Sequence, residues 1–219
     1  MRNLASLAAV DAARRNTGGN GGGPDGAPFR PLHGTYCFDA LPGTIERLLL
    51  GRPGGVPDDC LEGLPERAGR VALIWIDAFG WSFLEHHAGH PFLERVEAAG
   101  VVSKLTSQFP STTPAAAVTL ATGLPVGRHG RYEWYLYEPS VDAIICPLRL
   151  ARAGTKVAPG GLLFAGHGMR DLFPFDPWCG SLRAAGVTVA LSYPEEIVAS
   201  PVTAWTAGGG AILPHADPV

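Results

Sequence analysis

The sequence has 219 residues, of which 46% are hydrophobic, so it is long enough to bury a sizeable core and suits one domain better than two. Its 20 acidic and 17 basic residues give a formal net charge of -3, without the basic excess that binding to a nucleic-acid backbone normally requires. We therefore expect no nucleic-acid scaffold as a partner, although nucleic acid could still be a substrate.

The amino-terminal stretch does not have the pattern of a secretory signal. Leu4, Leu7 and Val10 are apolar, but Asp11 and Arg14 follow before a secretory core develops. No stretch approaches the roughly 18 uninterrupted apolar residues of a membrane span. The four cysteines are widely spaced and form no Cys-x-x-Cys pair; they are Cys37, Cys60, Cys146 and Cys179. We expect a soluble, cytoplasmic protein with reduced thiols and no membrane partner, and the sequence leaves its oligomeric state open.

Residues 1–35 are expected to form a flexible amino-terminal segment. Between Gly18 and Gly26, six of nine residues are glycine, a composition typical of a flexible linker. A phosphate-binding loop would need a preceding strand and a following Gly-Lys-Ser/Thr, and neither is present. We expect residues 36–219 to form one partial α/β domain.

The remaining chain alternates apolar strand patterns with helical patterns. In chain order it predicts a helix over 44–50, a strand over 71–76, helices over 80–87 and 91–99, a strand over 101–105, a helix over 114–122, a strand beginning at 143, a helix over 175–185 and a strand over 187–191. The run from Val71 to Ile76 is of the kind that is buried on both faces of a parallel sheet. This alternation indicates a three-layer α/β sandwich with a largely parallel central sheet.

Asp77 follows directly after the apolar run that ends at Ile76. Ligands in an open α/β sheet collect beyond the carboxyl ends of the strands, so this carboxylate is expected to face a crevice. A carboxylate there suits Zn²⁺, Mg²⁺ or Mn²⁺. The ordinary alternative is that Asp77 caps the helix that starts near Gly80.

Thr113 stands directly before Pro114, which opens a helix. Its hydroxyl is therefore expected at the positive end of a helix dipole, where a phosphoryl group is favoured. Threonine is a weak nucleophile unless a metal or a base activates its hydroxyl, so catalysis would need an ion nearby. An ordinary N-cap threonine is the alternative. We expect Asp77 and Thr113 to converge at the carboxyl edge of one parallel sheet.

Three stretches together resemble the type I phosphodiesterase/nucleotide pyrophosphatase family of the alkaline phosphatase superfamily. They are Val71–Asp77, Phe109–Pro114 and Ala121–Gly130, and the resemblance extends over about Arg70–His215. It implies that Asp77 is a metal ligand and that Thr113 is both the nucleophile and a metal ligand. It further implies two divalent ions, zinc with manganese or magnesium as alternatives, and a small phosphate ester or nucleotide as substrate.

The sequence departs from the family pattern in two respects. Ala116 stands where members often carry an asparagine that holds a phosphoryl oxygen, so backbone N–H groups would have to stabilise the oxyanion. The downstream Asp-x-x-x-His and Asp-His pairs, which supply further metal ligands, are absent, and Asp217 is the last aspartate. We therefore expect the amino-terminal half of the superfamily fold, as a fragment, a truncated product or a degenerate relative.

These departures leave alternative functions open. The first is a metal-dependent hydrolase of phosphate mono- or diesters with a threonine nucleophile. The others are a catalytically silent α/β fragment and a sulfate or phosphonate ester hydrolase of the same superfamily. With so few ligands, we expect this chain to bind metal poorly and to turn over phosphoesters slowly.

Other residues are weaker candidates. His86, His87 and His90 could form a local metal cluster, but a solvated surface is the expected role. His129 is expected to be structural, and His167 is expected to be a loop residue without an obvious partner. Some aromatic side chains could stack on a base or ester group, namely Trp134, Tyr135 and Tyr137. Packing in a hairpin is the commoner role of such side chains.

Overall fold

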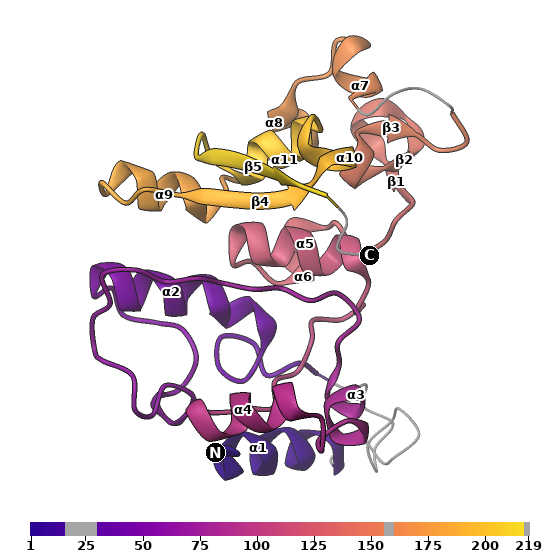
Figure 1. Ribbon diagram of the computed structural model, residues 1–219. Coiled ribbons are helices and arrows are strands. Elements are labelled where there is room, and N and C mark those ends of the chain that lie inside the picture. Colours follow the sequence, from indigo (N-terminus) through magenta and orange to yellow (C-terminus); the bar gives the residue numbers. More distant parts are fainter. Residues whose placement is uncertain (16–29, 156–159, 217–219) are drawn as a thin grey trace. The chain divides into compact units, whose positions relative to one another are not determined.

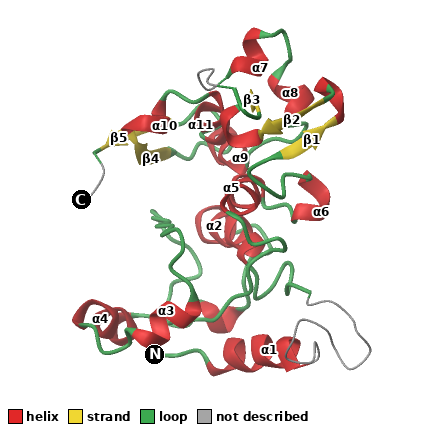
Figure 2. Cartoon of the chain, turned by 90° about the vertical axis from the view of Figure 1, so that its right-hand side faces the viewer, coloured by secondary structure: helices red, strands yellow, loops and turns green. Residues whose placement is uncertain are grey.

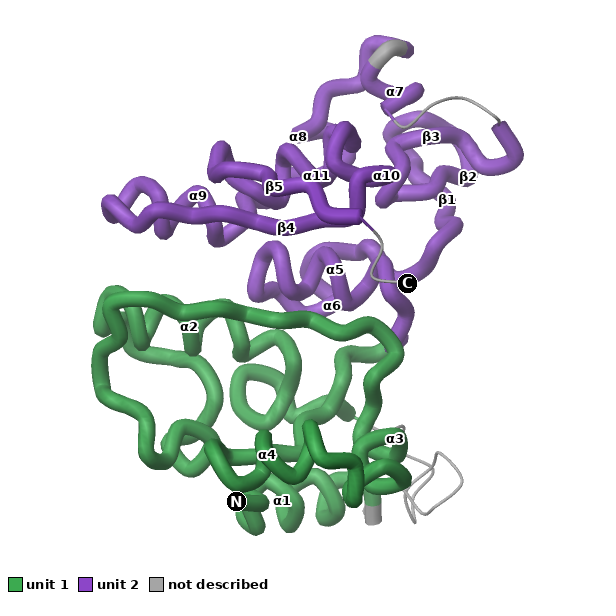
Figure 3. The backbone as a smooth tube through the Cα atoms, viewed as in Figure 1, with its two compact units in different colours: residues 1–109 green, residues 110–219 purple. Residues whose placement is uncertain are grey.

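The computed structural model describes residues 1–15, 30–155 and 160–216. The chain divides into two compact units, Met1–Phe109 and Pro110–Val219 (Figure 3). The glycine-rich stretch Gly18–Gly26 lies outside the described residues, so its predicted role as a linker stays a prediction. Within the described ranges, no helix is long and apolar enough to cross a membrane. All four cysteines are free thiols.

The first unit consists of helices joined by long irregular segments (Figure 1). The helix predicted over 44–50 begins earlier than expected, because Thr44 does not cap it but lies inside it and donates its hydroxyl hydrogen to the carbonyl of Ala40 at 2.9 Å. Its predicted end is confirmed, since Gly51 adopts a left-handed φ of 71°. The α-helices of this unit are α1 (Leu4–Arg15), α2 (Leu41–Leu50), α3 (Trp81–His86) and α4 (Pro91–Ala99), with short 3₁₀ turns at Phe38–Ala40 and Asp58–Cys60.

The buried strand predicted over 71–76 is wrong. The segment is irregular backbone, and each of its residues from Ala72 to Ile76 is exposed. The strand predicted over 101–105 is also wrong, since only Val102 within it forms an isolated bridge, to Arg2. A parallel strand needs partner strands to satisfy its backbone, and the described part of this unit provides isolated bridges only.

The second unit carries the two sheets of the described chain (Figure 2). Strands β1 (Leu136–Glu138), β2 (Ala143–Cys146) and β3 (Ala151–Arg152) form an antiparallel sheet in that order. Strands β4 (Ala190–Pro194) and β5 (Ala211–His215) form a separate parallel pair. The α-helices are α5 (Thr113–Thr122), α6 (Val126–His129), α7 (Gly161–Phe164), α8 (Met169–Leu172), α9 (Trp178–Ala184), α10 (Glu195–Val198) and α11 (Pro201–Thr206), with 3₁₀ turns at Pro139–Val141 and Pro147–Arg149.

The fold is mixed α/β, as expected, but a three-layer parallel sandwich is not confirmed. The strand expected from residue 143 is present as β2, yet both of its neighbours are antiparallel. The strand expected over 187–191 is shifted towards the carboxyl end and forms β4, the predicted parallel type. The helix expected over 175–185 begins at Trp178 because Pro177 occupies its N-cap.

The core of the second unit joins the antiparallel sheet to its surrounding helices. Ile145 of β2 and Leu150 are fully buried, and Val118 of α5 lies in the same cluster. Phe173 packs against Trp205 with ring centroids 4.8 Å apart. The complete buried cluster comprises Val118, Leu136, Val141, Ile145, Leu150, Leu162, Leu172, Phe173 and Val202.

Two adjacent isoleucines of β2 provide a matched test of this core. Ile145 is 0% exposed and Ile144 is 55% exposed. We expect Ile145→Ala to lower the free energy of unfolding by about 2–5 kcal/mol, because it deletes fully buried methyl groups and leaves a cavity. Ile144→Ala should change it by less than about 0.5 kcal/mol. Urea unfolding of both variants measures the difference, and equal losses would contradict the assignment of the two faces of β2.

Candidate functional site

Thr113 is the first residue of α5 and is half-buried. The N-cap is the preceding residue, Thr112, whose side chain makes no capping hydrogen bond. Its hydroxyl instead donates to the carbonyl of Tyr132 at 2.9 Å. The N-cap alternative for Thr113 is therefore wrong, and Thr113 lies in the first turn of a ten-residue helix whose dipole favours a negative charge there.

The helix that carries Thr113 packs against other elements of its own unit. Pro114, Ala115, Val118, Thr119 and Ala121 are all buried, and no residue of α5 is exposed. Trp178 of α9 donates its indole N–H to the carbonyl of Leu120 at 2.6 Å. The helix ends as predicted at Gly123, which has a left-handed φ of 69°. Packing of its buried residues and the bond from Trp178 hold the helix that carries Thr113.

His129 is buried beside α5. Its Nδ1 atom accepts a hydrogen bond from the amide of Arg131 at 3.0 Å, so the hydrogen of the neutral ring is on Nε2, which lies 2.9 Å from the Thr119 hydroxyl. Burial, reinforced by the positive charge of Arg131, lowers the pKa of His129 to about 4. Both ring nitrogens are used inside the unit, in keeping with a structural residue.

Arg131 holds the chain that follows His129. It is buried with Glu138, to which its guanidinium donates a hydrogen bond, and it also donates to the carbonyl of Leu172. Its guanidinium carbon lies 5.4 Å from the centre of the Phe173 ring. Burial by itself would raise the pKa of Glu138, but hydrogen bonds from Arg131 and Ser140 outweigh it and lower that pKa. These contacts join β1 to the end of α8.

Asp77 lies in the first unit and is exposed. Its carboxylate accepts a hydrogen bond from the amide of Ala78 at 2.9 Å, and Ala78 has a φ of 59°, a left-handed conformation that is costly for a residue with a side chain. Gly80 is the N-cap of α3, so Asp77 does not cap that helix. Asp77 and Thr113 belong to different units, and their predicted convergence stays a prediction.

The weaker candidates have separate surroundings. The rings of His86 and His87 lie edge to face at 4.8 Å, whereas the Nδ1 atom of His90 accepts from the amide of Phe92 and so caps α4. His167 is half-buried, and its amide bonds to the carbonyl of Leu162. The side chains of Trp134, Tyr135 and Tyr137 are exposed at and just before β1, and the hydroxyl of Tyr137 donates to Asp142 at 2.7 Å, which raises the pKa of Tyr137.

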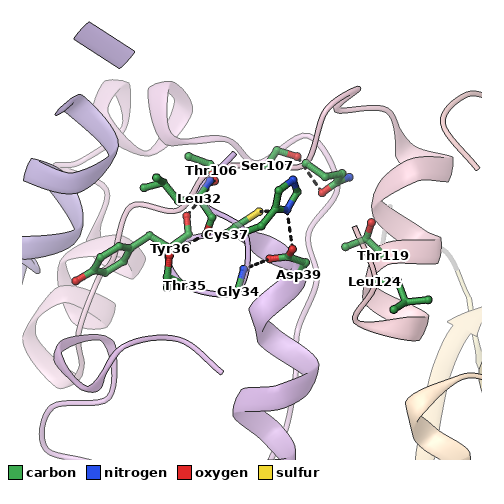
Figure 4. A network of polar contacts seen from close by, with 12 residues as sticks. Leu32, Gly34, Thr35, Tyr36, Cys37, Asp39, Thr106, Ser107, Thr119 and Leu124 are labelled. Carbon is green, nitrogen blue, oxygen red and sulfur yellow. Dashed lines mark hydrogen bonds and ion pairs between the residues drawn. The ribbon is translucent and has the colours of Figure 1, made fainter. Parts of the chain in front are cut away.

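A group of possible metal ligands that the sequence did not reveal lies in the first unit. Within the described ranges, His33, Cys37 and Asp39 form the one group of three or more histidine, cysteine or acidic side chains whose ligand atoms are close enough to hold an ion. In Figure 4, dashed contacts run from one ring nitrogen to the Cys37 sulfur and to the Asp39 carboxylate. The only sequence signal was the spacing His-x-x-x-Cys-x-Asp. Burial raises the pKa of the Cys37 thiol.

Comparison with protein-family models gives one match. The model described as "Type I phosphodiesterase / nucleotide pyrophosphatase" matches residues 71–190, more than half of the chain. The matched range includes Asp77 and Thr113 and excludes His33, Cys37 and Asp39. Searches of curated proteins and of solved structures found no match.

The buried imidazole predicts an acid-dependent loss of stability. His129 has a folded-state pKa of about 4, below its usual value of 6.5. Between these two pH values the imidazole is protonated in the unfolded chain but neutral in the folded chain, so acid favours unfolding. We expect the free energy of unfolding to fall in that window by at most about 1.4 kcal/mol per pH unit from this residue.

His129→Gln should remove this part of the pH dependence, whereas the exposed His86→Gln should retain it. Urea unfolding at several values from about pH 7 to 4.5 measures both slopes. A wild-type slope that survives unchanged in His129→Gln would contradict the assignment.

Proposed function

Because the chain belongs to the type I phosphodiesterase/nucleotide pyrophosphatase family, we propose that it hydrolyses phosphate mono- or diesters with Thr113 as the nucleophile. The proposed substrate is a small phosphate ester or a nucleotide. Sulfate and phosphonate esters are alternatives with a similar tetrahedral, anionic group, and the described residues give no observation that favours them.

One observation carries this proposal. Thr113 begins a buried ten-residue helix, and the N-cap side chain of that helix is bonded to Tyr132 rather than to the amides of the first turn. A phosphoryl group at this end gains from the helix dipole and from main-chain N–H groups. The motif around Thr113 lies within the matched range of the family.

The proposed reaction has two steps. In the first, the hydroxyl of Thr113 loses its proton and its Oγ1 atom forms a bond to phosphorus, the ester P–O bond breaks, and the leaving alcohol takes up a proton. In the second, water loses a proton and attacks phosphorus, the bond between phosphorus and Oγ1 breaks, and Oγ1 regains a proton. The product is phosphate, or a phosphate monoester when the substrate is a diester. Since Ala116 has no side-chain donor, stabilisation of the oxyanion by this helix rests on its backbone N–H groups.

The family is generally metal-dependent, and we propose Asp77 as a ligand, with zinc as the expected ion and manganese or magnesium as alternatives. The described residues do not fit a two-ion centre around it. No group of three metal-binding side chains among them includes Asp77, and one carboxylate with one hydroxyl is fewer than the four donors zinc normally takes. We therefore expect slow turnover from this chain alone.

A second candidate function follows from the small number of metal ligands around Asp77. A catalytically silent α/β protein that retains the family motif would also expose Asp77 and lack a metal group around it. The two candidates differ in one respect, namely whether Thr113 reacts with a phosphoester.

Hydrolysis of nitrophenyl phosphate and bis(nitrophenyl) phosphate, with added zinc or manganese, tests the proposal. We expect slow turnover by the wild-type chain and only the background rate from Thr113→Ala, because that variant lacks the nucleophile. Thr122→Ala is the matched control, since it removes the same hydroxyl from the opposite end of α5, and it should keep most of the turnover. Equal background rates for the wild type and Thr113→Ala would support the silent alternative, and equal rates above background would contradict Thr113 as the nucleophile.

A further inference from the structure

We propose that His33, Cys37 and Asp39 bind one zinc ion in the first unit, outside the range matched by the family model. This site is separate from Asp77 and Thr113, and the proposal does not rest on the proposed function. Zinc is the ion that this donor set fits best, because a thiolate, an imidazole and a carboxylate are its usual protein ligands.

The distances suit a single ion. The Nδ1 atom of His33 lies 2.7 Å from a carboxylate oxygen of Asp39 and 3.9 Å from the sulfur of Cys37, and all three ligand atoms lie within 4.8 Å of one another. Zinc bonds of about 2.0–2.3 Å in a tetrahedral arrangement place two ligand atoms about 3.3–3.7 Å apart. Shifts on the order of 1 Å or less would bring the three atoms onto one ion.

The loop that carries these side chains is held in place by Thr106. The hydroxyl of Thr106 accepts from the amide of Leu32 at 3.0 Å and donates to the carbonyl of Tyr36 at 3.0 Å (Figure 4). Thr106 also exchanges backbone hydrogen bonds with this segment, donating to Tyr36 and accepting from Phe38. The ligands are therefore presented by a loop that is fixed at both ends, which lowers the entropy cost of binding an ion.

The surroundings of the individual ligands also suit a metal. The second carboxylate oxygen of Asp39 accepts from the amide of Gly34 at 3.1 Å, which orients the carboxylate as outer-shell partners of metal ligands do. Cys37 and Asp39 are buried, whereas His33 is exposed. Three protein ligands leave the fourth position of a tetrahedral ion to water, which can reach the ion from the side of the exposed His33.

A nucleophilic cysteine activated by histidine and aspartate is a poorer explanation of the same cluster. Such a relay uses both nitrogens of the imidazole, one facing the thiol and the other facing the carboxylate. Here the thiol and the carboxylate both face Nδ1 of His33. Cys37 is also 0% exposed, so a substrate could not reach its sulfur without a change in the loop. Convergence of three donors on one point is the arrangement that an ion requires.

Titration of the full chain with Co²⁺, which replaces zinc and absorbs visibly in tetrahedral sites, tests the proposal. We expect one equivalent to bind, with a thiolate-to-cobalt charge-transfer band that an equivalent of Zn²⁺ abolishes. Cys37→Ser should remove the charge-transfer band. His33→Ala should weaken zinc binding at least about tenfold in competition with a chelator, since it deletes a direct ligand.

Two controls keep the result interpretable. Because the His33 side chain is exposed, His33→Ala is expected to leave the fold intact, which circular dichroism checks. Cys60→Ser changes another thiol of the same unit, which lies 3.5 Å from the side-chain nitrogen of Asn3, and should leave the band unchanged. The proposal is overturned if no saturable binding occurs, if the band follows Cys60, or if His33→Ala binds zinc as tightly as the wild type.

Discussion

Packing of α5 against its neighbours in the second unit is the constraint on which the candidate phosphoryl site depends. A helix with a polar face can rotate or fray at its exposed edge, but α5 is held by Val118 in the core, by the pair Thr119–His129 and by the bond from Trp178 to Leu120. These contacts hold the middle of the helix whose first residue is Thr113. The helix that carries the proposed nucleophile is therefore positioned by contacts within the second unit.

The first unit shows what happens when such a constraint is missing. The apolar run Val71–Ile76 looks like a central strand, yet among the described residues it has no strand partners and exposes most of its apolar side chains. Exposed apolar runs of this kind carry a cost in water and favour pairing with another strand. Asp77, at the end of this run, is exposed, whereas Thr113 is half-buried.

This contrast explains how much could be predicted from sequence. Helices α4 and α5 were predicted to within one residue because their signals are local: Pro91 and Pro114 mark their starts, and Gly100 and Gly123 follow their ends. The strands over 71–76 and 101–105 failed because a strand exists only with its partners, which a local pattern does not contain. Thr113 became a candidate through its motif, whereas the cluster around Cys37 depends on contacts with the distant Thr106 and has only a weak spacing signal.

The central claim, that Thr113 accepts a phosphoryl group, can be tested without turnover. The chain is incubated with an activated nitrophenyl phosphate and a divalent ion, quenched in acid, digested, and mapped by mass spectrometry. The account predicts a phosphoryl group on Thr113, which acid preserves because a phosphothreonine ester is stable there. A chain that releases nitrophenol while Thr113 stays unmodified and another residue carries the phosphoryl group would contradict it, as would a complete lack of modification.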